Sequence, residues 1–185
     1  VRLRLTANGK DKTILEKEID RRFDALSSLL KDDIYAKKDV GLEIVVNELL
    51  NHHNYSLATA ESCTGGGISA LITSVPGSSD IIKTKELNVS NELILKYGAV
   101  SEKVVIAMSN GVKNKFKTDF SIAVTGIAGP SGGTAEKPVG TTWIAISTPE
   151  KTIAKLFQFG EHRGRNIERA KIAALNMLRK SILNQ

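Results

Sequence analysis

The sequence predicts an α/β protein with helices on both faces of a mixed sheet. From Gly41 onward, apolar segments with helical spacing alternate with short apolar segments of strand length, which is typical of a three-layer α/β/α domain. Near the C-terminus the strand-like segments TTWIAIST and TIAKLFQF are separated only by PEK, and so short a connection predicts an antiparallel hairpin. The sheet is therefore expected to be mixed, not purely parallel.

Residues 1–40 are predicted to form a separate segment that precedes this domain. Val1, Leu3 and Leu5 alternate with polar residues, which predicts a strand with one wet face. Apolar residues at helical spacing predict an amphipathic helix from Lys12 to Leu30, followed by a polar linker. One strand and one helix cannot enclose a core. We expect residues 1–40 to be a fragment of another module, or an arm that packs on a neighbour.

Residues 41–185 are predicted to form the main domain, with regular alternation of elements. In order, the expected elements are a helix from Leu42 to the NHHN segment, a strand at SLATA, a helix over TGGGISALITSV, helices over NELILKYG and SEKVVIAMSNGVKNKFKT, a buried strand at FSIAVT, a loop at GIAGPSGGTAEKPVG, the hairpin, and a helix from about Arg165 to Ile182. The long glycine-rich loop has the length of loops that usually carry function.

The bulk composition is that of a soluble globular protein, with 41% hydrophobic and 25% charged residues in 185. No apolar run approaches the roughly 20 residues of a membrane helix, and the first residues do not resemble a signal peptide. The only cysteine, Cys63, excludes an internal disulfide framework, so we expect a cytoplasmic protein with no membrane partner.

The ionisable residues predict neither a metal centre nor a nucleic-acid interface. The net charge of +6 is spread among acidic residues, which permits nucleic-acid binding without requiring it, and we do not expect nucleic acid as a partner. His52, His53 and His162 show no metal-ligand spacing. We therefore expect no metal ion and no cofactor.

Ser62 lies between a predicted strand and a helix whose first turn contains Thr64 and Gly65. The free backbone N–H groups of such a turn can bind an anion or stabilise an oxyanion in front of Ser62. Alternatively, Ser62 or Thr64 only caps the helix, and the glycines allow close packing. The spacing leaves both interpretations open. For Cys63, which has no histidine partner nearby, we expect the role of a small buried residue.

A serine nucleophile requires a base, and a desolvated lysine can serve as one. The candidate lysines are Lys83, Lys85, Lys96 and Lys137.

A second group of candidates follows the predicted strand FSIAVT. Thr125 and Gly126 stand where loops of open α/β sheets bind ligands. Arg163 or Arg165, before the last helix, could hold a phosphate or a carboxylate, or could simply begin a surface helix.

Four segments, TAESCTGG, VPGSSD, YGAVSE and AVTGIAGPSGGTAEKPVGT, occur in this order and resemble the CinA C-terminal (PncC) family. The resemblance extends from about Gly41 to Ile182, and residues 1–40 resemble the tail of the KH-like middle module of CinA competence/damage-inducible proteins. It implies a nicotinamide-nucleotide amidase of pyridine nucleotide salvage, which converts nicotinamide mononucleotide and water to nicotinate mononucleotide and ammonia, and it implies a homo-oligomer, at least a dimer. The alternative is a non-catalytic nucleotide-binding or regulatory module.

Position by position, the resemblance implies roles for individual residues. Ser62 is the implied nucleophile and Lys83 the implied base. The residues implied in substrate binding are Thr64, Gly65, Ser79, Thr125, Gly126 and Arg163. The family's tyrosine has no counterpart here, because the chain is shorter than the family between Asp80 and Ile81. Either a mobile loop is missing from the 185 residues or it is deleted; the good match on both sides favours a mobile loop.

Overall fold

The structure is a computed structural model that describes residues 2–78, 81–84 and 90–185, without the side chains of Lys83 and Thr84. The contacts between residues divide the chain into two compact units, residues 1–39 and residues 40–185.

The first unit consists of one long helix and irregular chain. Helix α1 spans Lys12–Leu30, and the Asp11 carboxylate caps it by accepting a hydrogen bond from the N–H of Ile14 at 3.1 Å. A 3-10 turn, Lys31–Asp33, follows. The helix was expected with these bounds, but the strand expected at the N-terminus was wrong, because residues 2–8 form no strand. A strand needs a partner for its backbone groups, and the described part of this unit offers none.

The second unit is built on one mixed sheet with the strand order β2-β1-β3-β4-β5. The strands are β1 Leu57–Glu61, β2 Ile82–Thr84, β3 Phe120–Gly126, β4 Thr141–Ser147 and β5 Thr152–Gln158. β1 runs parallel to both β2 and β3, whereas β4 is antiparallel to β3 and to β5. The predicted mixed sheet and the hairpin are therefore confirmed. The short strand β2 was not predicted, because three residues are too few to show a period.

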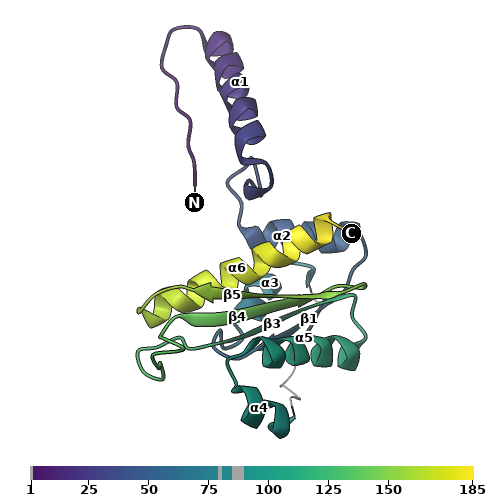
Figure 1. Ribbon diagram of the computed structural model, residues 1–185. Coiled ribbons are helices and arrows are strands. Elements are labelled where there is room, and N and C mark those ends of the chain that lie inside the picture. Colours follow the sequence, from purple (N-terminus) through teal and green to yellow (C-terminus); the bar gives the residue numbers. More distant parts are fainter. Residues whose placement is uncertain (1, 79–80, 85–89) are drawn as a thin grey trace. The chain divides into compact units, whose positions relative to one another are not determined.

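Helices cover both faces of this sheet (Figure 1). Helices α2 Leu42–His52, α3 Gly67–Thr73 and α6 Arg163–Leu183 pack on one face, around large apolar side chains such as Leu57, Ile122 and Leu175. Helices α4 Asn91–Tyr97 and α5 Glu102–Phe116 pack on the other face, where the strands present mainly alanines. The predicted three-layer α/β/α architecture is confirmed.

The segments that carry the motifs lie together at one edge of the sheet, the edge formed by the ends of the strands. The parallel strands β1 and β3 both end there, so the turn at residues 62–66 (the Ser62 turn) and the loop at residues 127–140 (the glycine loop) lie at the same edge. Because β4 and β5 are antiparallel partners, β4 begins and β5 ends at this edge as well. Helix α6 then starts from it. β5 is the outermost strand of the order on its side.

Helix α3 begins at Gly67, three residues later than its pattern predicted. The reason is the backbone of Gly65 and Gly66, whose φ angles of +58° and +84° lie outside the right-handed helical region. The glycines thus extend the turn after Ser62 instead of starting the helix.

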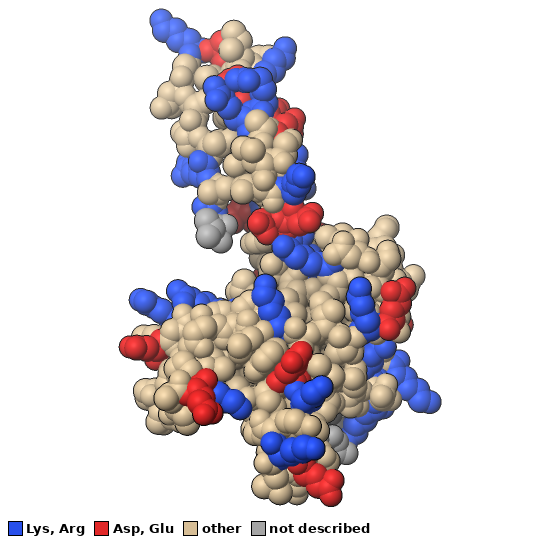
Figure 2. Space-filling view, viewed as in Figure 1, with Lys and Arg blue, Asp and Glu red and all other residues tan. Residues whose placement is uncertain are grey.

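The surface of the second unit carries charges of both signs. On the face drawn in Figure 2, the basic and acidic side chains of this unit are interspersed and do not form one basic patch. Within residues 2–78, 81–84 and 90–185, none of the helices has the length and apolarity needed to span a bilayer.

Candidate active site

The Ser62 turn follows β1 directly and is held by backbone hydrogen bonds. The N–H of Ser62 donates to the carbonyl of Val124 in β3 at 3.0 Å, and the N–H of Gly65 donates back to the Ser62 carbonyl at 3.1 Å. A Cβ atom added at Gly65 or Gly66 would meet nothing within 4 Å. The side chain of Ser62 is exposed and makes no hydrogen bond within the described residues. Ser62 therefore lies on an open, ordered turn.

Glu61, the last residue of β1, caps helix α3. Its Oε2 accepts a hydrogen bond from the N–H of Ile68 at 2.9 Å, and its Oε1 accepts one from the N–H of Ser69 at 2.9 Å. One interpretation of the sequence made Ser62 or Thr64 the cap. In the structure neither of them has this role. Glu61 was not predicted as a cap, because it lies six residues before the first residue of α3, outside the usual capping positions.

Glu61 also changes which amides can face a ligand. The first amides of α3 are occupied by the carboxylate, whereas the N–H groups of Thr64 and Gly66 bind no acceptor within the described residues. An anion at this turn would therefore be met by amides of the Ser62 turn itself, not by the end of the helix.

Thr64 adds an unused hydroxyl to this turn. Its side chain is only 4% exposed, and its Oγ1 has no hydrogen-bond partner among the described residues. Buried hydroxyls are almost always hydrogen-bonded, so this one at a candidate site calls for a partner from outside the described residues, such as a ligand.

Cys63 fills the space between the Ser62 turn and the end of β3. A Cβ atom added at Gly126 would lie 3.1 Å from the Cys63 sulfur and 2.7 Å from Oγ1 of Thr142, so only glycine fits at position 126. Burial raises the pKa of the Cys63 thiol to about 11, and the nearby Glu61 charge acts in the same direction. The thiol therefore stays protonated at neutral pH, which disfavours Cys63 as a nucleophile.

Thr125 lies beside Gly126 but points to the opposite face of the sheet. Its side chain is buried, and its Oγ1 donates to the carbonyl of Ala99 at 2.9 Å. In this structure the Thr125 hydroxyl therefore fixes the turn after α4. Its neighbour Gly126 is the residue of the pair that faces Cys63.

Lys137 extends from the glycine loop to the same turn. Its amine donates to the carbonyl of Val100 at 2.9 Å and lies 3.5 Å from the carbonyl of Tyr97. These are carbonyls at and beyond the end of α4, where a cation is favourable. The candidate lysine Lys137 thus joins two of the motifs instead of pointing at Ser62 through any recorded contact.

Arg163 and Asn166, at the start of α6, hold the base of the glycine loop. Nη1 of Arg163 donates to the carbonyl of Gly129 at 2.9 Å, and the charge of Arg163 acts on the Cys63 thiol. The buried amide of Asn166 donates to the carbonyls of Ala128 and Gly160. The Arg165 side chain makes no hydrogen bond within the described residues, so Arg163 fits the site better. Asn166 was missed, although it falls on the buried face of its helix, four residues before Ala170.

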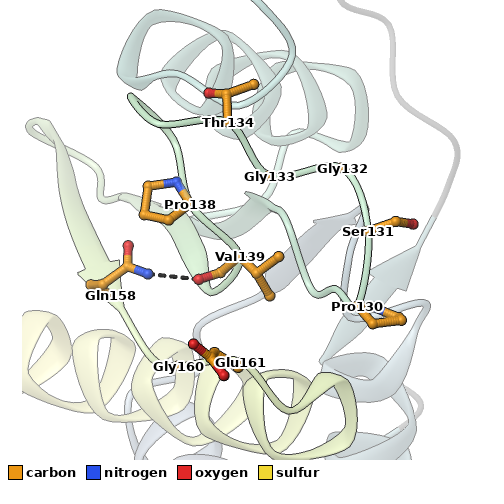
Figure 3. A pocket seen from close by; sticks show the side chains of 10 residues that line it. All are labelled: Pro130, Ser131, Gly132, Gly133, Thr134, Pro138, Val139, Gln158, Gly160 and Glu161. Carbon is orange, nitrogen blue, oxygen red and sulfur yellow. Dashed lines mark hydrogen bonds between the residues drawn. The ribbon is translucent and has the colours of Figure 1, made fainter.

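A cavity of about 760 Å³ lies between the glycine loop and the residues at and just after the end of β5. Figure 3 shows its lining, which comes from residues 130–134, Pro138 and Val139 of the loop and from Gln158, Gly160 and Glu161. The Gln158 side chain is already bound, because it donates to the carbonyl of Val139 at 2.7 Å. Ser62 does not line this cavity. The chemistry of the Ser62 turn, not the size of the cavity, therefore defines the candidate site.

Two of the expected site residues lie partly or wholly outside the described residues. Ser79 lies there entirely, together with Asp80; the flanking N–H of Ile81 donates to the carbonyl of Ser78 at 3.0 Å. The side chain of Lys83 lies outside as well, but its backbone pairs with Ala58 in β1. Ala58 precedes Ser62 by four residues, or roughly 13 Å along a strand. This is further than a lysine side chain extends.

Comparison with known proteins places the chain in a family. The family model described as CinA C-terminal domain matches residues 40–182. The chain is 42% identical to a CinA-like protein of Flavobacterium psychrophilum, over 99% of the chain and 47% of that protein, and 39% identical to one of Cytophaga hutchinsonii, over 98% and 46%. The chain thus spans about half the length of these curated relatives.

Solved structures agree with this assignment. The competence/damage inducible protein CihA of Agrobacterium tumefaciens superposes with a TM-score of 0.73 and 31% identity, over 78% of this chain and 94% of that one. A CinA superfamily protein of Klebsiella pneumoniae superposes with a TM-score of 0.71 and 28% identity, over 78% and 97%. Sequence, fold and the ordered motifs at one edge of the sheet agree: the chain belongs to the CinA C-terminal domain family.

Proposed function

We propose that this chain is a nicotinamide-nucleotide amidase, which hydrolyses the carboxamide of nicotinamide mononucleotide to nicotinate mononucleotide and ammonia. The observation that carries the proposal is the Ser62 turn. Among the described residues, it combines an exposed serine hydroxyl, two amides without acceptors at Thr64 and Gly66, and the buried unpaired hydroxyl of Thr64. A nucleophile beside several unpaired donors is the arrangement that acyl transfer requires.

In the proposed reaction Ser62 attacks the carboxamide carbon while its proton passes to the Lys83 amine. The carbonyl oxygen becomes an oxyanion, which the amides of Thr64 and Gly66 stabilise, an effect typically worth about 3–4 kcal/mol per donor. The C–N bond then breaks, and the proton held by Lys83 leaves with the nitrogen as ammonia. Water attacks the resulting acyl ester, which releases nicotinate mononucleotide and restores the serine.

Substrate binding is assigned to residues around this turn. Gly65 and Gly126 would border the nicotinamide, Thr125 would act indirectly by holding the turn at Ala99, and Arg163 would meet the phosphate. A guanidinium has five N–H donors, and the recorded bond to Gly129 uses one of them, so others are available for a phosphate.

The strand register limits how Lys83 can act on Ser62. Because Lys83 pairs with Ala58, a bridging hydroxyl or water must carry the proton between the lysine amine and Ser62. Ser79 is the serine of the family motif nearest to Lys83 in sequence, and a hydroxyl there could be that bridge or could itself be acylated. The experiment must therefore distinguish the two serines.

The deciding experiment measures ammonia release from nicotinamide mononucleotide by the purified chain, with Ser62→Ala, Ser79→Ala and Lys83→Met as variants. We expect Ser62→Ala and Lys83→Met to lower kcat by about 10³-fold or more. Rapid-quench mass spectrometry should detect an acyl-enzyme in the wild type, and peptide mapping assigns it to one serine. An acyl group on Ser79 would overturn the assignment of Ser62 as nucleophile.

The alternative function, a non-catalytic nucleotide-binding module, gives a different result. Calorimetry would then show the nucleotide binding to the wild-type chain with no ammonia released. Lys103→Met is a suitable control in both assays, because the Lys103 side chain is exposed on α5 and makes no hydrogen bond within the described residues.

A further inference from the structure

Glu61 precedes the Ser62 turn, and its side chain is hydrogen-bonded to the residues that follow the turn. Besides the amides of Ile68 and Ser69, its carboxylate accepts a hydrogen bond from Oγ of Ser69 at 2.7 Å. Oγ of Ser69 also lies 2.7 Å from Oγ1 of Thr59. Since the single Ser69 hydroxyl proton goes to Glu61, the Thr59 hydroxyl must donate to Ser69. This chain of bonds, from Thr59 through Ser69 to Glu61, is called the Glu61 latch.

The latch connects the strand before the Ser62 turn to the helix after it. Residues 62–67 are thus enclosed between two fixed points, the end of β1 and the start of α3. Within this segment Gly65 and Gly66 have no neighbour within 4 Å of a Cβ position, so packing does not hold the turn there. Hydrogen bonds must hold it, and those to an ionised carboxylate are the strongest available.

The recorded bonds of the Glu61 carboxylate all go to the start of α3. Glu61 uses both oxygens on α3, and no recorded bond joins it to Ser62. Its charge therefore supports the backbone without occupying the amides of Thr64 and Gly66.

We propose that Glu61 is a positioning residue, which sets the geometry of the Ser62 turn by binding the start of α3 and does not itself touch the substrate. The inference rests on the proposed function for its kinetic consequence, but the latch itself can be tested without any substrate.

Asp119 offers a matched control on the same strand pair. Its Oδ2 accepts hydrogen bonds from the backbone N–H and the hydroxyl of Ser56, at 2.8 and 2.7 Å. This carboxylate binds backbone as Glu61 does, but at the opposite end of β1. Asp119→Asn should therefore reproduce the loss of a carboxylate–amide contact without disturbing the Ser62 turn.

Glu61→Gln keeps the size of the side chain but places an NH₂ group where one backbone N–H or hydroxyl now donates. We expect kcat for ammonia release to fall by about 10²-fold, because small displacements of reacting groups are that costly, with KM within twofold. Asp119→Asn should keep kcat within twofold at a similar loss of melting temperature. Equal kcat values for the two variants, or a rise in KM alone, would overturn the positioning role.

Amide hydrogen exchange tests the latch independently of activity. Glu61→Gln should speed exchange over residues 62–69, and Asp119→Asn should not. Unchanged exchange there in Glu61→Gln overturns the latch, whether or not the wild type is an amidase. If the wild type releases no ammonia while exchange responds as expected, the proposed function fails and the latch stands.

Ser69→Ala provides a milder variant, should Glu61→Gln fail to fold. It removes the two hydroxyl bonds of the latch, to Glu61 and from Thr59, and keeps both amide bonds, so kcat should fall by a smaller factor with the same KM. Thr73→Ala on the same helix removes a hydroxyl that binds only the carbonyls of Ser69 and Ala70, and it should leave kcat unchanged. A Ser69→Ala variant with the kcat of Thr73→Ala would contradict the proposal.

Discussion

At the scale of single residues, the site is distinguished by groups that the described part of the chain does not bind. Ser62 presents a hydroxyl on an open turn, and Thr64 has a buried hydroxyl with no partner among these residues. Cys63, between them, is kept neutral by burial, which raises its pKa. The three side chains are consecutive in sequence, yet their environments differ. The first is exposed, the second is buried and stays protonated, and the third is buried without a partner among the described residues.

Thr64→Val should separate stability from function. Valine has the same shape and removes a buried hydroxyl that has no partner among the described residues, so the melting temperature should stay the same or rise. If the bound nucleotide supplies the partner of this hydroxyl, kcat/KM for ammonia release should fall by about tenfold or more. Thr118→Val is the control: its hydroxyl is equally buried but donates to the carbonyl of Phe120 at 2.9 Å, so that variant should melt lower. A lower melting temperature for Thr64→Val would show that the hydroxyl has a partner in solution.

The Cys63 thiol should make folding sensitive to alkaline pH. With the folded-state pKa raised to about 11, the unfolded chain loses this proton first as the pH rises above about 9. Stability is therefore intact below pH 9 and falls toward pH 11, by at most about 1.4 kcal/mol per pH unit. Urea unfolding at several pH values, compared with Cys63→Ala, isolates this contribution. Parallel curves for the two proteins would refute it.

At the scale of elements, the motifs cooperate through loops that bind one another. The glycine loop is held on one side by Arg163 and Asn166 of α6, and on the other it holds the turn after α4 through Lys137. Helix α4 follows directly on the segment that carries Lys83 and Lys85 in sequence. The conformations of these loops therefore depend on one another, and a substitution that loosens one loop should also loosen the next.

Lys137→Met should loosen the turn after α4. The methionine keeps the stem but loses the donations to the carbonyls of Val100 and Tyr97, and we expect a loss of about 1–2 kcal/mol in the free energy of unfolding. Hydrogen exchange should quicken over residues 94–100. The exposed Lys103→Met variant should change neither quantity; if the two variants behave alike, Lys137 contributes nothing specific.

The sequence predicted the elements with long apolar periods, and it placed Ser62 and Thr125 at the ends of two predicted strands. It did not predict that α3 starts at Gly67, because positive φ angles at Gly65 and Gly66 leave no mark on the apolar pattern. Nor did it reveal that Glu61 caps α3 or that the Thr125 hydroxyl binds the carbonyl of Ala99. Both contacts depend on which groups the folded chain brings together. The local pattern of apolar residues shows whether a segment has the period of a helix or of a strand, whereas such contacts depend on the assembled fold.

At the scale of the whole molecule, the two units differ in what they can bury. Residues 40–185 enclose a core on both faces of the sheet. Helix α1 of the first unit has no buried residue, and its Leu29 is 81% exposed. A segment of 39 residues with so little burial is below the size at which chains usually fold alone.

A fragment of residues 40–185 should therefore keep a cooperative thermal transition, and a peptide of residues 1–39 should show none. Circular dichroism at 222 nm during heating measures both. A cooperative transition in the isolated peptide would contradict the prediction, as would a gradual, non-cooperative melt of the larger fragment.

The outermost strand β5 has a consequence for self-association. An edge strand offers its backbone to any other chain, and β5 also exposes Ile153 and Leu156. Lys155 stands between these two residues, at the middle of the strand. If two copies paired antiparallel through β5 about this point, two ammonium groups would face each other across the new ladder. An antiparallel pairing centred on Lys155 is therefore disfavoured by charge, even though this strand exposes apolar side chains.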